Sequence, residues 1–199
     1  MSGAAAGGTI AQSYLMAERV GTAIAKSGQI VTTGATVGLS YYAAYGATKA
    51  GGMSIGFSPA SSLREHLRKY RLPYDCYDYI NFTGLHYVGR DLYLVQSSDA
   101  IITVGGRFGS LHEFTSALEA GKPCGILIDS GGTADIIKSL MQLLEPPHQE
   151  LVIYDDDPER LVHKVIALVN KKYKDIHEQL NNRDEQWFLR LDHKPPHAG

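Results

Sequence analysis

Three glycine-bearing segments of this 199-residue sequence have the composition of anion-binding loops. They cover residues 2–8, 33–38 and 105–110, and each lies beside a short apolar run. Glycine lets backbone N–H groups approach an anion closely, and the start of a following helix adds partial positive charge. Any one of these segments is explained about as well by ordinary turn geometry. If the three meet at one edge of a sheet, they favour a ligand that carries a phosphate.

The third segment leads into an expected helix that carries a carboxylate. Leu111, Phe114 and Leu118 recur there at spacings of three and four, which is typical of a core-facing stripe. At about 100° per residue, Glu113 lies about 200° from Leu111, so its side chain should face a cleft or solvent. The alternative is a capping box, in which Glu113 bonds back to the amide of Ser110. Spacing alone slightly favours the capping box.

An arginine and an aspartate precede this loop. Arg90 lies in an expected helix whose apolar stripe is Val88, Leu92 and Val95, and it is about 200° from that stripe. It is therefore either a ligand-binding group or, more commonly for such a position, a solvated arginine. Asp99 precedes an apolar run and is interpreted as a strand-end cap in preference to an anchor for another site residue.

The elements that must position these side chains alternate between strands and helices. Expected strands cover residues 29–33, 53–58, 100–104, 124–129 and 151–154, and expected helices cover residues 13–27, 39–50, 86–97, 110–120, 133–144 and 158–172. A short charged helix should open at the capping box of Ser62 and Glu65, and residues 72–84 show no regular pattern. This alternation predicts an α/β fold, a Rossmann-like doubly wound parallel sheet flanked by helices. Ligands of such sheets bind beyond the carboxyl ends of the strands, where the glycine loops should lie.

The chain is expected to form a single domain with an appendage. Residues 1–172 are assigned to a nucleotide-binding domain, and residues 173–199 to a polar helical tail with Trp187 and Phe188 as a docking or dimer contact. Doubly wound domains normally begin with a strand before the first glycine loop, whereas residues 2–9 already look like that loop. Either the first strand lies outside this sequence or the sheet is one strand short.

Composition excludes several classes of function. With 19 basic and 21 acidic residues the net charge is −2, which gives no electrostatic footprint for nucleic acid or an anionic membrane. No apolar run approaches the roughly 20 residues of a membrane span, and no signal peptide is visible. Cys76 and Cys124 are not spaced as metal ligands, and the eight histidines are scattered. We therefore expect a cytoplasmic protein with free thiols, no metal and no cofactor.

The third loop and the upstream arginine resemble the Lonely Guy (LOG) family, often mislabelled lysine decarboxylases. Residues 105–113 match the glycines and the glutamate of the family's motif, and Arg90, nine positions before Asp99, matches its arginine. Residues 33–39 and 50–60 look like the family's second phosphate loop and third strand. The resemblance covers about residues 2–145.

The sequence departs from the family's pattern at four positions. Val104 replaces the leading proline of the motif and Ser110 its threonine, while Asp91 and Leu94 replace the lysine and the methionine after the arginine. Serine keeps the hydroxyl that a phosphate needs. The loss of the lysine bears on the substrate more than on the fold.

The resemblance implies a phosphoribohydrolase that cleaves the N-glycosidic bond of a nucleoside 5′-monophosphate, releasing free base and ribose 5-phosphate. Glu113 would stabilise positive charge on the ribosyl ring and orient or deprotonate water, and Arg90 would hold phosphate or ribose oxygens. The candidate phosphate- and nucleotide-binding residues are Gly3, Gly34, Gly38, Gly105, Gly106, Arg107, Gly109 and Ser110. The family also implies a homodimer, for which the aromatic-rich residues 70–87 are a candidate surface unless they are core.

The alternative is a binding protein on the same scaffold. It would be a non-catalytic carrier or sensor for a nucleotide or for a pterin such as the molybdenum cofactor. Related carriers lack the glutamate–arginine pair, so the presence of both Glu113 and Arg90 favours the enzyme.

Overall fold

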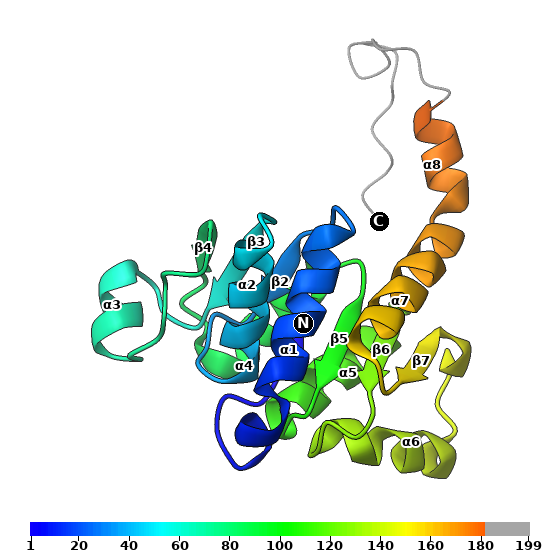
Figure 1. Ribbon diagram of the computed structural model, residues 1–199, viewed down its shortest axis with the longest axis horizontal. Coiled ribbons are helices and arrows are strands. Elements are labelled where there is room, and N and C mark those ends of the chain that lie inside the picture. The colour runs from blue at the N-terminus through cyan, green and yellow to red at the C-terminus, as the bar shows by residue number, and fades with distance from the viewer. Residues whose placement is uncertain (182–199) are drawn as a thin grey trace.

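The computed structural model describes residues 1–181, and its described strands all pair in parallel (Figure 1). The strands are β1 (Ser2–Gly3), β2 (Val31–Thr33), β3 (Ser54–Ser58), β4 (Tyr79–Phe82), β5 (Ile101–Val104), β6 (Cys124–Leu127) and β7 (Val152–Asp155). They form a sheet of order β1-β5-β6-β7 and a sheet of order β2-β3-β4. The Met1 nitrogen donates a hydrogen bond to the Thr32 carbonyl oxygen at 2.5 Å, so β1 joins the two sheets. The predicted parallel α/β fold is confirmed.

The first strand is present but short. β1 lies in the middle of the combined sheet, where Ser2 pairs with Thr103 and Gly3 with Val104 of β5. The expectation that the sheet lacks this strand is therefore wrong. The strand was missed because its two residues carry no apolar pattern.

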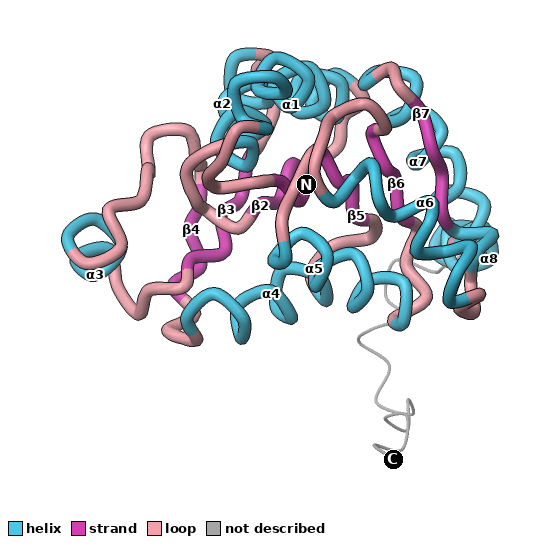
Figure 2. Tube along the Cα trace, turned by 90° about the horizontal axis from the view of Figure 1, so that it is seen from below, coloured by secondary structure: helices cyan, strands magenta, loops and turns pink. Residues whose placement is uncertain are grey.

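Helices cover both faces of the sheet (Figure 2). They are α1 (Thr9–Lys26), α2 (Leu39–Lys49), α3 (Leu63–Arg68), α4 (His86–Gln96), α5 (Phe108–Glu119), α6 (Thr133–Leu144), α7 (Pro158–Lys172) and α8 (Lys174–Asn181), with a 3₁₀ turn at Gln149–Leu151. One apolar core joins α1, α2 and α7 to the sheet, and a second joins α4, α5 and α6 to its other face. β5 serves both cores, because Ile101 packs into the second and Ile102 into the first.

The apolar stripe expected on α4 is wrong at two of its three residues, because Val95 is buried in the second core as predicted whereas Val88 and Leu92 are exposed. Val88 is 71% exposed and Leu92 50%, whereas Arg90 and Asp91 are buried beside Leu94. Helical periodicity finds the apolar face of a helix but does not say whether that face meets the sheet. The inward face of α4 carries an ion pair beside Leu94 and Val95, while Val88 and Leu92 face outward.

Other expectations hold with small shifts of boundary. α6 and α7 have the predicted bounds, and Asp157 caps α7 by accepting a hydrogen bond from the Arg160 N–H at 2.9 Å. The edge strand β4 was missed because it lies within the irregular residues 72–84 and is only partly buried. The predicted contacts at Trp187 and Phe188 lie outside the described residues, and the division at residue 172 stays a prediction. Within residues 1–181 no helix has the length and apolar character needed to cross a membrane.

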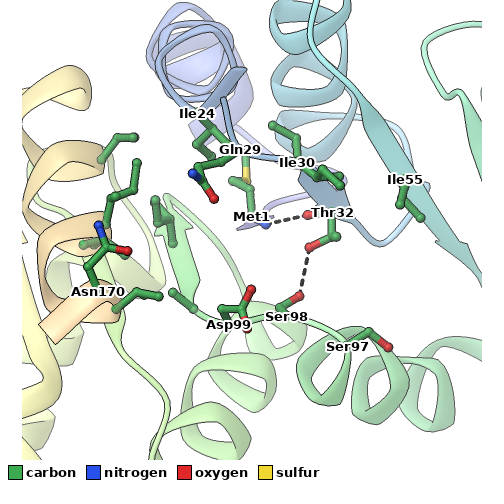
Figure 3. A pocket seen from close by; sticks show the side chains of 17 residues that line it. Met1, Ile24, Gln29, Ile30, Thr32, Ile55, Ser97, Ser98, Asp99 and Asn170 are labelled. Carbon is green, nitrogen blue, oxygen red and sulfur yellow. Dashed lines mark hydrogen bonds between the residues drawn. The ribbon is translucent and has the colours of Figure 1, made fainter. Parts of the chain in front are cut away.

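A cavity of about 290 Å³ lies at the amino ends of the strands, between β2 and β5, where the short β1 does not reach (Figure 3). Its walls include Ile24 of α1 and Val165 of α7, and the Thr32 and Ser98 hydroxyls meet across it at 2.9 Å. The exposed Asp99 lines this cavity, at the edge opposite the glycine loops. Its side chain makes no hydrogen bond to the described residues, so the structure supports neither a strand-end cap nor an anchor for the site.

Candidate functional site

The three glycine loops converge on one cavity of about 300 Å³ at the carboxyl ends of β1, β2 and β5. The structure therefore brings together segments that are up to about a hundred residues apart in the chain. Seven of the ten candidate site residues line the cavity: Gly3, Gly34, Arg90, Arg107, Gly109, Ser110 and Glu113. Sequence reasoning did not assign Thr36, Ser40, Tyr87, Asp91 and Phe108, which also line it.

Three predicted glycines support the loops without lining the cavity. Gly105 donates its N–H to the Ser130 hydroxyl at 2.7 Å, and the Gly106 carbonyl accepts the Thr133 N–H at 3.2 Å. Both bonds fasten the third loop to the start of α6. Gly38 has a φ of +80°, and an added Cβ there would lie 2.3 Å from the Ala4 carbonyl oxygen. These glycines shape the site, and direct contact with a ligand is not indicated for them.

The first turn of α5 offers unpaired donors to the cavity. Within the described residues, the backbone N–H groups of Phe108, Gly109 and Ser110 make no hydrogen bond, whereas Leu111 N–H bonds to the Arg107 carbonyl at 3.0 Å. Free first-turn amides and the helix dipole together favour an anion. Gly109 and Ser110 line the cavity, so the amino-terminal end of α5 faces it.

Glu113 lies one turn further along α5 and is only 7% exposed. The helix begins at Phe108, with Arg107 as its N-cap and no side-chain cap bond, so the capping box of Ser110 and Glu113 is wrong. Burial raises the pKa of Glu113 to about 7; Arg90 opposes the shift, and the Asp91 carboxylate adds to it. A carboxyl group near its midpoint at neutral pH suits proton transfer.

Arg90 reaches the cavity from α4 and is 4% exposed. Its Nη1 donates to the Phe57 carbonyl oxygen at 3.2 Å, and its Nε lies 3.2 Å from Asp91 Oδ1. That ion pair lacks hydrogen-bond geometry, so Nε is a buried donor without a hydrogen-bond partner. A buried polar atom of this kind is rare and commonly marks a site that binds something else.

Gly34 makes room for this arginine. A Cβ added at Gly34 would lie 1.6 Å from Nη1 of Arg90. The glycine of the second loop is therefore needed to let the guanidinium lie against the backbone.

Asp91 connects the arginine to a histidine on the neighbouring helix. Its Oδ2 lies 3.1 Å from Nδ1 of His112, while Oδ1 faces Arg90. Arg90 and Asp91 of α4 and His112 of α5 thus form one polar cluster beside Glu113. The sequence shows Asp91 only as a departure from a family lysine, and nothing in helical spacing placed it inward.

The mouth of the cavity carries aromatic and basic side chains. Tyr87 is 46% exposed and Phe108 88% exposed, and Arg107 stands between the glycine loop and α5. Among the described residues no group of three or more histidine, cysteine, aspartate or glutamate side chains could hold a metal ion. Cys76 and Cys124 are both free, as predicted, and both are buried.

The fold and the site define a Rossmann-like α/β protein whose glycine loops line a cavity at the carboxyl ends of its strands. The chain belongs to the SLOG cluster4 family, whose model matches residues 2–162. This family is LOG-like, and the resemblance drawn from the sequence is confirmed at that level.

Named relatives include carriers and a protein of no stated function. An uncharacterized protein from Archaeoglobus fulgidus is 34% identical over 111 residues, covering 56% of this chain and 68% of the relative. The molybdenum cofactor carrier protein from Chlamydomonas reinhardtii is 29% identical with a TM-score of 0.69, covering 85% of this chain and 94% of that one. The molybdenum cofactor binding protein from Rippkaea orientalis is 27% identical with a TM-score of 0.66, covering 79% and 88%. A binding role on this fold is therefore supported.

Proposed function

We propose that this protein hydrolyses the N-glycosidic bond of a nucleoside 5′-monophosphate to give free base and ribose 5-phosphate. One observation carries the proposal. The buried Glu113 and Arg90 line the same cavity as the free amides at the start of α5. An anion site, a buried carboxyl group and a buried guanidinium are the groups that this reaction needs.

In the proposed reaction the phosphate binds at the first turn of α5, with Arg107 at its side. Arg90 donates to ribose or phosphate oxygens through its Nε, which faces Asp91 but makes no hydrogen bond in the free protein. As the C1′–N bond breaks, positive charge grows on the ribosyl ring and the ionised Glu113 stabilises it. Glu113 accepts a proton from the water whose oxygen bonds to C1′, and the electron pair of the broken C1′–N bond stays on the base. The base nitrogen takes up a proton from solvent and Glu113 returns its proton to solvent, so that one water is consumed in all.

Base release tests the proposal directly. Purified protein is incubated with each common nucleoside monophosphate, and free base is measured by chromatography. We expect release by the wild type and a loss of about 100-fold or more in Glu113→Gln, because a positioned general base contributes about 10²–10⁴-fold. Glu119→Gln, an exposed position on the same helix, is the matched control and should keep the wild-type rate. Equal rates in wild type and Glu113→Gln contradict the assigned role.

A carrier or sensor is the second candidate function. It is favoured by the two structures named as molybdenum cofactor proteins, which are 27% and 29% identical to this chain. A pterin cofactor also carries a phosphate, which the start of α5 could bind. If no nucleotide yields base while a nucleotide or a pterin raises the melting temperature, the binding function replaces hydrolysis.

The proposal includes a homodimer formed through α4. Leu85, Val88 and Leu92 are 42%, 71% and 50% exposed and recur at spacings of three and four. This outward stripe is the kind of apolar surface that self-associating proteins bury.

A further inference from the structure

We propose that Tyr87 and Phe108 form a stacking surface for the nucleobase, so that the cavity selects phosphates that carry a base over those that do not. We call these two residues the aromatic rim. The inference rests on the proposed substrate class and names the part of the site that would recognise the base.

The aromatic rim comes from two helices that both start at the cavity. Tyr87 is in the first turn of α4, and Phe108 is the first residue of α5. Both line the cavity, yet Phe108 leaves 88% of its surface exposed and Tyr87 46%. A phenyl ring that is so exposed gains almost nothing from folding of this chain. Its position at a cavity mouth suits contact with a bound apolar ring.

Neighbouring side chains hold Tyr87 in place. The Tyr70 and Tyr87 rings meet edge to face, with centroids 5.6 Å apart and an angle of 84° between their planes. The Tyr70 hydroxyl in turn lies 2.6 Å from Nδ1 of His86. A ring fixed before binding loses less conformational freedom when a ligand stacks on it.

The backbone is strained at His86, the residue directly before Tyr87. His86 has a φ of +57°, in the left-handed region that residues other than glycine rarely adopt. Such strain persists only where the surroundings over-determine the conformation, and it clusters at ligand sites. Here the strained residue, His86, bonds to the Tyr70 hydroxyl and is also the first residue of the helix that carries Tyr87.

The distribution of polarity suggests how a nucleotide would lie. The buried groups, Arg90 and Glu113, and the free amides of α5 match a sugar phosphate, while the exposed aromatic rim matches a planar ring. Every nucleobase has a π-face, so stacking of this kind discriminates weakly among bases. It discriminates strongly between a nucleotide and the bare sugar phosphate.

Calorimetric titrations with adenosine monophosphate and ribose 5-phosphate test the aromatic rim. The Glu113→Gln background prevents turnover during the titration. On it we expect Phe108→Ala to weaken adenosine monophosphate binding about ten-fold and to leave ribose 5-phosphate binding unchanged. Phe108→Trp should restore nucleotide affinity. Tyr79→Ala, at a 61% exposed aromatic residue that does not line the cavity, should change neither titration.

The outcomes separate this inference from the proposed reaction. Equal weakening of both ligands, no effect of Phe108→Ala, or no nucleotide binding by the background protein overturns the stacking surface. A lower molecular mass of Phe108→Ala in solution with unchanged nucleotide affinity also overturns it, because Phe108 is then a subunit contact. If the wild type releases no base while the ten-fold loss is still seen, the stacking surface stands and hydrolysis fails.

Discussion

At the scale of single residues, Glu113 links the site to the stability of the fold. Its pKa is about 7 in the folded protein because it is buried, against an ordinary value of 4.5 for the unfolded chain. Between these two values the folded state binds the proton more strongly than the unfolded state. The free energy of unfolding contributed by this group is therefore highest below about pH 4.5 and falls as the pH rises toward 7.

In the Glu113→Gln variant the free energy of unfolding should not fall in this way as the pH rises. A shift of this size corresponds to about 3 kcal/mol, so the variant should gain up to that amount relative to wild type between pH 5 and pH 8. Urea unfolding of both proteins at the two pH values measures the difference. Glu119→Gln should show no such dependence. A constant difference between Glu113→Gln and wild type across this range would mean that the carboxyl group is not held in its neutral form.

At the scale of elements, the β2–α2 loop contacts α4 where Gly34 lies against the guanidinium of Arg90. Gly34→Ala would place a methyl group 1.6 Å from Nη1 of Arg90, so the guanidinium must move out of its position. We expect nucleotide binding to weaken about ten-fold or more, because a charge-assisted bidentate contact is lost. Gly8→Ala is the control, since a Cβ there meets nothing within 4 Å. Isothermal titration measures both, and unchanged affinity in Gly34→Ala contradicts a ligand-binding role for Arg90.

Such contacts between elements mark the limit of what the sequence could predict. The alternation of strands and helices and the convergence of the glycine loops followed from local pattern and from the rule for parallel sheets. For Glu113 the spacing left a cleft, solvent and a capping box open, and only the structure places it in the cavity. The inward position of Arg90 and Asp91 was not predicted. Their burial depends on an ion pair and on the space left by Gly34, which are tertiary facts without a local signal. The exposed Phe108 carried no signal at all, because a single aromatic residue in sequence looks like core.

At the scale of the whole molecule, the proposed homodimer would cover the exposed apolar stripe of α4. The stripe of Leu85, Val88 and Leu92 faces away from both cores of its own subunit. In a two-fold symmetric dimer the same stripe meets its copy, so one substitution acts twice across the interface. A glutamate at its centre would place two carboxylates close together in an apolar contact, which costs far more than a charge on a free surface.

We therefore expect the wild type to show twice the monomer mass by light scattering after gel filtration, and Val88→Glu to show the monomer mass. Leu143→Glu adds the same charge at a 79% exposed apolar residue of α6 and should leave the dimer intact. Circular dichroism establishes that both variants keep the fold. A monomeric wild type, or a Val88→Glu protein that stays dimeric, would show that α4 is not the interface. If the dimer forms, α4 serves two partners, because Arg90 and Asp91 face inward to the site while Val88 and Leu92 face outward to the second subunit.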